Sequence, residues 1–168
     1  RRISSLSRSN MFVEAILRRA LMEMEALGIR RVLTHSEKAA AYMADGYARA
    51  ARRPGVCMAQ SVGAANLASG LQEPFLGHAP VVALTGRAAL TAQQRHAYQE
   101  IRHAPLFAAV TKSSAPVTTA DQLPRLLRQA FRDVEHDDVA QFLECSEMRE
   151  GAADHAAADQ RNFLPSHV

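Results

Sequence analysis

Glu37 is the residue of this chain whose position most favours chemistry. It begins a long Ala-rich segment of helical pattern and follows a short apolar run, residues 29–34, that predicts a strand. Open α/β sheets place their ligands at the carboxyl ends of strands, so a carboxyl group there is well located for binding. A second such position follows the next predicted strand, in the loop Ser61–Asn66, where Gly63 allows close approach of the backbone. Together the two segments predict a small-molecule site at one end of a sheet.

The same spacing also allows a purely structural interpretation. Thr34 and Glu37 fit the T-x-x-E capping box, in which the Glu bonds back to the cap residue. A Glu in the first helical turn is favoured by the helix macrodipole as well. Asn66 would then be an ordinary helix residue after a strand-to-helix turn. Spacing alone does not decide between a cap and a site.

Strand and helix patterns alternate along the chain, which predicts a three-layer α/β fold. The sheet should be mostly parallel and covered by helices on both faces. Helices are expected at 11–27, 36–51, 64–76, 98–107 and 120–133, and strands at 29–34, 56–60, 80–85, 109–112 and 139–145. We expect a disordered leader at 1–10, one domain at 11–147 and a flexible tail at 148–168.

Composition excludes several function classes. The formal net charge of +3 comes mainly from scattered Arg residues, with no basic run interleaved with aromatic residues, so nucleic-acid binding is not expected. Apolar runs are too short to span a membrane, and no secretory signal is evident. Cys57 and Cys145 lack metal-site spacing and predict buried, reduced thiols in a cytoplasmic protein. The His residues also lack metal-ligand spacing, and His96 and His103, seven apart, are expected on a surface face.

Six motifs in chain order carry a family resemblance. They are H-S-E-K-A-A-A-Y-M-A-D-G-Y-A-R-A at 35–50, R-P-G-V at 53–56, S-V-G-A-A-N-L at 61–67, P-V-V-A-L-T-G at 80–86, A-Y-Q-E at 97–100 and V-T-K at 110–112. Each alone is weak, but their order and spacing resemble the pyrimidine-binding domain of acetolactate-synthase-like thiamine-diphosphate enzymes. The resemblance covers residues 29–133 and implies a flavodoxin-like fold.

The resemblance implies roles for particular residues. Glu37 matches the family's Glu that hydrogen-bonds the N1′ nitrogen of the cofactor's aminopyrimidine and so promotes loss of the thiazolium C2 proton. Such a carboxyl group needs an apolar, water-poor pocket to share a proton near neutral pH. The loop residues Ser61, Gly63 and Asn66 would approach the cofactor, with Gln60 facing the same crevice. Gln99 resembles the family's polar residue near the reacting substrate carbons, although a solvated helix start explains it equally well.

The sequence departs from the family pattern in four places. The glycine loop is one residue shorter than S-G-P-G-x-x-N and lacks its proline, and P-G-P-V is altered at 138–143. The family's first helix and strand, which end in a G-x-P-G turn, are expected to be missing, because only ten polar residues precede the helix that starts at Met11. The G-D-G…N motif that holds the diphosphate through Mg²⁺ is also absent. The resemblance therefore implies half of a shared thiamine diphosphate site, completed by the pyrophosphate-binding domain of another chain in a homo- or hetero-oligomer.

The leading hypothesis is a half-site for 2-keto acid decarboxylation and carboligation, inactive without its second half. The small subunit of a two-chain 2-keto acid decarboxylase is a variant of it. The alternative is a non-catalytic dimerisation or regulatory remnant that keeps the fold. A generic flavodoxin-like nucleotide module is disfavoured because no usual phosphate loop is present.

Overall fold

The computed structural model describes residues 15–137 and 141–146. The helices are α1 (Ala15–Ala26), α2 (Glu37–Ala51), α3 (Gly63–Leu76), α4 (His103–Phe107) and α5 (Gln122–Asp137). The strands are β1 (Gly55–Gln60), β2 (Val81–Arg87), β3 (Ser113–Val117) and β4 (Gln141–Ser146). The predicted leader and tail lie outside the described residues. None of the described helices is both long and apolar enough to cross a membrane.

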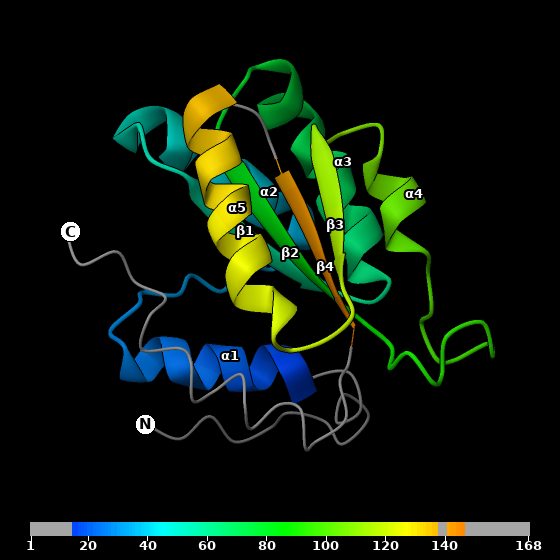
Figure 1. Cartoon of the computed structure of the whole chain (residues 1–168). Helices are drawn as coiled ribbons and strands as arrows, with labels where there is room; N and C mark the ends of the chain where they lie inside the picture. Colours follow the sequence, from blue (N-terminus) through cyan, green and yellow to red (C-terminus); the bar gives the residue numbers. More distant parts are fainter. Residues whose placement is uncertain (1–14, 138–140, 147–168) are drawn as a thin grey trace.

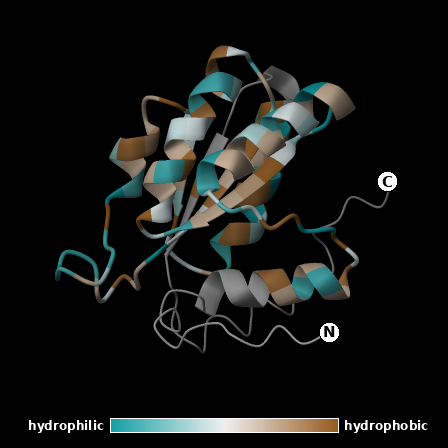
Figure 2. Cartoon of the chain, turned by 180° about the vertical axis from the view of Figure 1, so that it is seen from behind, coloured by the Kyte–Doolittle hydropathy of each residue, from teal (hydrophilic) through white to brown (hydrophobic). Residues whose placement is uncertain are grey.

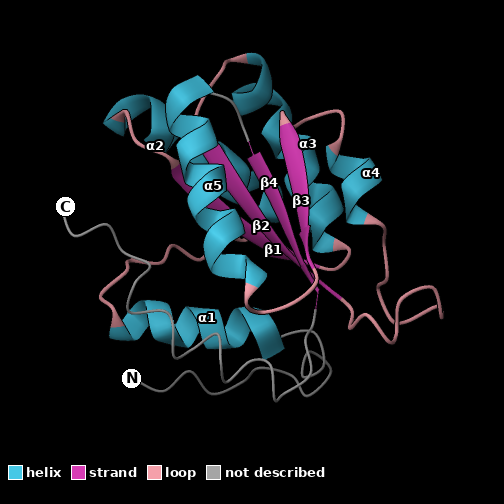
Figure 3. Ribbon diagram, in the orientation of Figure 1, coloured by secondary structure: helices cyan, strands magenta, loops and turns pink. Residues whose placement is uncertain are grey.

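The strands form one parallel sheet in the order β1-β2-β4-β3. Parallel strands need crossover connections, and these are right-handed in nearly all proteins. The chain passes from β1 to β2 through α3 in one direction and from β3 to β4 through α5 in the other. Right-handed crossovers in opposite directions put α3 and α5 on opposite faces of the sheet (Figures 1 and 3). The predicted α/β fold with helices on both faces is confirmed.

Each face of the sheet has its own apolar core. Between the sheet and the α2–α3–α4 layer, small residues from α2 pack with Leu67, Leu71 and Phe107. Beneath α5, Ala130 and Val134 pack with Val82 and Leu143. The short side chains of Ala41, Ala44 and Ala48 let α2 lie close to the sheet, which explains the Ala-rich composition of this helix.

Three predicted elements are wrong in type or position. Residues 29–34 form no strand: Val32 is 56% and Leu33 98% exposed, and no described strand lies beside them. A β-branched run becomes a strand only where a neighbouring strand pairs with it. The sheet as described therefore has β1 and β3 as its edges.

The predicted helix at 98–107 is reduced to α4, which starts at His103. Pro105 explains the late start, because a proline is tolerated in the first helical turn and breaks a helix interior. The strand predicted at 109–112 is also wrong, since β3 begins at Ser113. There Thr111 donates its hydroxyl proton to the Phe107 carbonyl at 2.9 Å and so extends the end of α4.

Candidate functional site

Ser36, and not Thr34, is the cap of helix α2. Ser36 has an extended backbone, and its hydroxyl accepts a hydrogen bond from the Ala39 amide at 3.2 Å. Thr34 instead donates to the Ser36 carbonyl at 2.9 Å. Glu37 is therefore the first helical residue and cannot act as the back-bonding Glu of a capping box at Thr34. This correction leaves the carboxylate free for another role.

The carboxylate of Glu37 faces the start of helix α3. Its Oε2 accepts a hydrogen bond from Asn66 Nδ2 at 3.2 Å. Its Oε1 lies over Gly63, where an added Cβ would be 2.6 Å away, inside van der Waals contact. Glu37, Gly63 and Asn66, separated by up to 29 residues in sequence, thus meet at the carboxyl end of β1.

The turn between β1 and α3 has an uncommon backbone. Ser61 is buried and has φ 49°, the left-handed region that costs a non-glycine residue about 1–2 kcal/mol. Its amide donates to the Gly86 carbonyl at 2.8 Å, and its carbonyl accepts from the Ala64 amide at 3.1 Å. Gln60, the last residue of β1, lies in register with Gly86 and is half-buried. The turn is therefore joined to the end of β2.

His103 is buried behind this turn, contrary to the surface position expected from its spacing to His96. Its Nδ1 lies 2.8 Å from Thr85 Oγ1 and its Nε2 lies 3.0 Å from the Ser61 carbonyl oxygen. His103 connects the end of β2, the start of α4 and the Ser61 turn. Spacing failed to find it because seven residues on one helix imply a shared face, whereas His96 lies outside α4.

Gln99 lies in the irregular segment before α4. It is exposed, has φ 58°, and its Nε2 donates to the Tyr98 hydroxyl at 3.3 Å. Glu100 fixes this segment by accepting hydrogen bonds from the amides of Gln94 at 2.6 Å and Ala97 at 3.3 Å. No hydrogen bond within the described part of the chain joins Gln99 to Glu37. Gln99 therefore remains a predicted site residue on a separate loop.

The Glu37 carboxylate retains hydrogen-bonding capacity. The carboxylate is half-buried, and Asn66 is its only hydrogen-bond partner among residues 15–137 and 141–146. One carboxylate oxygen remains available to bond an N–H group or to share a proton with a ring nitrogen. Within those same ranges, no three His, Cys, Asp or Glu side chains form a group that could hold a metal ion.

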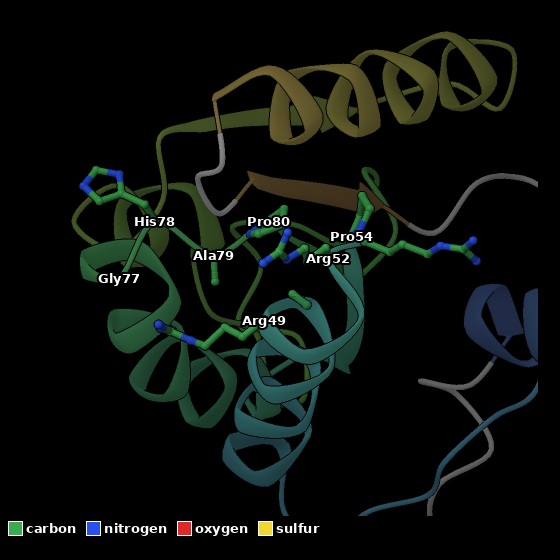
Figure 4. Close-up of a pocket in the computed structure, with 9 residues that line it drawn as sticks. Arg49, Arg52, Pro54, Gly77, His78, Ala79 and Pro80 are labelled. Carbon is green, nitrogen blue, oxygen red and sulfur yellow. The ribbon is translucent and has the colours of Figure 1, made fainter.

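A hollow of about 380 Å³ lies at the end of the sheet opposite to Glu37, before β1 and β2 (Figure 4). Arg49 reaches across it toward Gly77, bonding Asp45 at 2.7 Å and the Glu73 carbonyl at 3.4 Å. Helices α2 and α3 both end at this hollow, and the negative ends of their dipoles favour nearby cations. Arg49 thus stabilises the end of α3, and we assign this hollow no ligand.

Comparisons with known proteins identify the family of the chain. The family described as "Thiamine pyrophosphate enzyme, N-terminal TPP binding domain" matches residues 13–106, more than half of the chain. The acetolactate synthase isozyme 2 large subunit of Escherichia coli (strain K12) is 41% identical over 105 residues, covering 62% of this chain and 19% of that protein.

Two further relatives come from distant organisms. Acetolactate synthase 3, chloroplastic, of Brassica napus is 38% identical over 104 residues, covering 61% of this chain and 16% of that protein. The probable acetolactate synthase large subunit of Methanocaldococcus jannaschii is 39% identical over 101 residues, covering 60% of this chain and 17% of that protein. The chain thus spans less than a fifth of the length of these relatives.

Proposed function

Because the chain belongs to the family of thiamine pyrophosphate enzyme N-terminal domains, we propose that it supplies the aminopyrimidine half of a thiamine diphosphate site. The proposed reaction is decarboxylation of a 2-keto acid followed by carboligation, as the acetolactate synthase names of the relatives suggest. The chain would work only together with a pyrophosphate-binding domain.

The observation that carries this proposal is the placement of the Glu37 carboxylate. A Cβ at position 63 would occupy space next to Oε1, so glycine keeps this oxygen accessible. Asn66 donates to the other oxygen at 3.2 Å and so restrains the carboxylate. A flat heterocycle that carries a ring nitrogen fits against such a group, which supports Glu37, Gly63 and Asn66 as cofactor-binding residues.

The bound cofactor would supply the carbanion chemistry, and the chain supplies position and proton control. Glu37 would hold a proton between its carboxylate and the ring nitrogen, which makes it the residue proposed for catalysis. Here the carboxylate is half-buried, and a partner domain closing over it would remove more water and disfavour its charged form. Ser61 and Gln60 would shape the crevice wall, and Gln99 would face the substrate.

The diphosphate and its Mg²⁺ would be held by a pyrophosphate-binding domain of another chain. Support for such a partner comes from the outward surface of α2, which belongs to the helical layer seen from behind in Figure 2. Met43 is 50% and Tyr47 52% exposed, and Gly46 between them has no atom near its Cβ position. Positions 43, 46, 47 and 50 share one helical stripe. An apolar stripe of this kind is typical of an interface.

Complementation with a matched relative tests the proposal. The large subunit from E. coli would be produced without the segment that aligns with this chain and then mixed with this chain, thiamine diphosphate and Mg²⁺. Acetolactate formation in the mixture, and its loss with Glu37→Gln, is the expected result. Glu73→Gln, an exposed carboxylate at the other end of α3, is the matched control and should remain active.

Calorimetric titration of the chain alone with thiamine diphosphate and Mg²⁺ separates the remaining possibilities. No heat with the chain alone, together with activity in the mixture, supports a half-site. Heat that Glu37→Gln removes would show that the chain holds the cofactor unaided. A folded mixture that binds no cofactor would favour the non-catalytic dimerisation or regulatory role.

A further inference from the structure

We propose that His103 is a positioning residue, which holds the Ser61 turn in its left-handed conformation and thereby places Gly63 and Asn66 against Glu37. Its importance for catalysis depends on the function proposed above, but its effect on the turn does not. The inference stands on the burial of His103 and on the contacts made by its two ring nitrogens.

The partners of His103 determine which nitrogen carries the proton. The Ser61 carbonyl can only accept, so His103 Nε2, at 3.0 Å, must donate to it. In the neutral ring Nδ1 is then an acceptor, and the Thr85 hydroxyl at 2.8 Å donates to it. The side chains of His103 and Thr85 are both fully buried, at 0% exposure. Neither nitrogen has water as an alternative partner, so the ring is held in one orientation.

The turn needs such support because its backbone is unfavourable. Ser61 adopts φ 49°, a conformation that persists only where surrounding contacts impose it. The Gly86 carbonyl accepts from the Ser61 amide, and the Ser61 carbonyl accepts from both the Ala64 amide at 3.1 Å and His103 Nε2 at 3.0 Å. Without His103, the Ala64 amide, which belongs to α3 itself, would still bond this carbonyl, but the link from the turn to α4 and β2 through His103 would be lost. Ser61 and the first turn of α3 would then shift together as Ser61 relaxes from its left-handed conformation.

The first turn of α3 carries the residues that meet Glu37. Gly63 is the first residue of this helix, and Asn66 follows it by three positions. A shift of this turn would therefore move the Asn66 amide away from Oε2 of Glu37 and change the space above Gly63. Thus His103 acts on Glu37 through the backbone and without touching it.

Amide hydrogen exchange on the intact chain tests this role without any cofactor. Thr85→Val removes the hydroxyl at nearly constant volume, whereas Thr85→Ser retains a hydroxyl. His103→Phe removes both hydrogen bonds of the imidazole ring. We expect the exchange rate of the amides at residues 63–66 to rise about tenfold in Thr85→Val, which corresponds to the loss of one buried hydrogen bond. The exchange rates of the amides in β2 should not change. Thr85→Ser should return exchange to the wild-type rate.

Thr111→Val is the matched control, because Thr111 is also buried and its hydroxyl bonds the Phe107 carbonyl at 2.9 Å, away from the turn. It should leave exchange at 63–66 unchanged. Unaltered exchange at 63–66 in Thr85→Val, or an equal rise throughout β2, would overturn the proposal, and so would a neutral Nδ1–H tautomer of His103 in nitrogen-15 NMR. Should His103→Phe fail to fold, the two Thr85 variants decide. If hydrogen exchange shows an ordered turn but the complemented mixture binds no thiamine diphosphate, only the proposed function is rejected.

Discussion

A substitution at Gly63 should change the geometry of the site while changing stability little, because Gly63 lies against the Glu37 carboxylate. Gly63→Ala puts a methyl group 2.6 Å from the present position of Glu37 Oε1, so the carboxylate must move. The obstructing atom is the end of a flexible side chain, and Ala is a better helix residue than Gly. We expect the free energy of unfolding, measured with denaturant, to change by less than about 1 kcal/mol. Activity in the complemented mixture should fall about a hundredfold, as for a misplacement of about 1 Å.

Gly46→Ala is the control for the stability measurement alone, because a Cβ at position 46 meets nothing within 4 Å, while its place on the proposed interface of α2 excludes it as a control for activity. It should raise the free energy of unfolding of the isolated chain by about 0.5–1 kcal/mol, the usual gain at an exposed helical glycine. Full activity in Gly63→Ala would mean that Glu37 Oε1 needs no open space there, and the proposed contact with a heterocycle would lose its basis.

The buried thiol of Cys57 predicts how stability depends on pH at the alkaline end. Desolvation by burial raises its pKa from 9.0 to about 12. Above pH 9 the unfolded chain loses this proton while the folded chain retains it, so stability falls between pH 9 and about 12, by up to about 1.4 kcal/mol per pH unit. Denaturant unfolding at pH 8, 9.5 and 10.5 measures this fall in the free energy of unfolding. In Cys57→Ala the free energy of unfolding should depend less on pH over the same range. An equal slope in Cys57→Ala would assign the loss to other groups.

At the scale of elements, the start of helix α2 gives a direct test of the corrected cap. Ser36→Ala removes the side chain that accepts the Ala39 amide and should cost about 1 kcal/mol of stability. Thr34→Val removes a hydroxyl that bonds the Ser36 carbonyl and caps no helix amide in the described part of the chain, so a smaller loss is expected. Thermal and denaturant unfolding of both variants measures the difference. A larger loss for Thr34→Val would restore the capping box that the sequence suggested.

Hydrophobic periodicity predicted the elements that bury an apolar face. It failed where pairing with another segment of the chain decides whether an element forms. Helices α2, α3 and α5 and strands β1, β2 and β4 were expected close to their observed positions, since each packs in a core. Residues 29–34 have strand-like composition without a paired neighbour, which no local pattern reveals. Pro105 lies in the first turn of α4, and the prediction of a helix at 98–107 took no account of it.

The site followed the same rule. Glu37, Gly63 and Asn66 were predicted together from the family motifs and from the expectation that Glu37 and the loop each follow a strand. The strand expected before Glu37 is absent, but the start of α2 still meets the turn after β1. Their mutual contacts agree with that expectation, although cofactor binding by these residues stays a prediction. His103 was missed because its partners, Thr85 and Ser61, lie 18 and 42 residues away in sequence. Only the folded sheet brings these three together.

At the scale of the whole molecule, the exposed α2 stripe predicts where a partner domain binds. Tyr47 is 52% exposed and makes no hydrogen bond within the described part of the chain, so Tyr47→Lys should change the stability of the isolated chain by less than about 0.5 kcal/mol. Buried in an interface, the same lysine would carry an unpaired charge, which costs several kcal/mol. Activity in the complemented mixture should therefore fall more than tenfold, and sedimentation should show less complex.

Gln129→Lys on α5 is the matched substitution, because residue 129 is exposed and α5 covers the opposite face of the sheet. It adds the same charge to the chain and should leave complex formation intact. If both variants weaken association equally, the added charge acts through long-range repulsion, which high salt would relieve. If neither does, the partner binds elsewhere, and the apolar stripe of Met43, Gly46, Tyr47 and Ala50 has no part in completing the site. Loss in Tyr47→Lys alone, unchanged by salt, places the second half of the active site against α2, the helix that begins with Glu37.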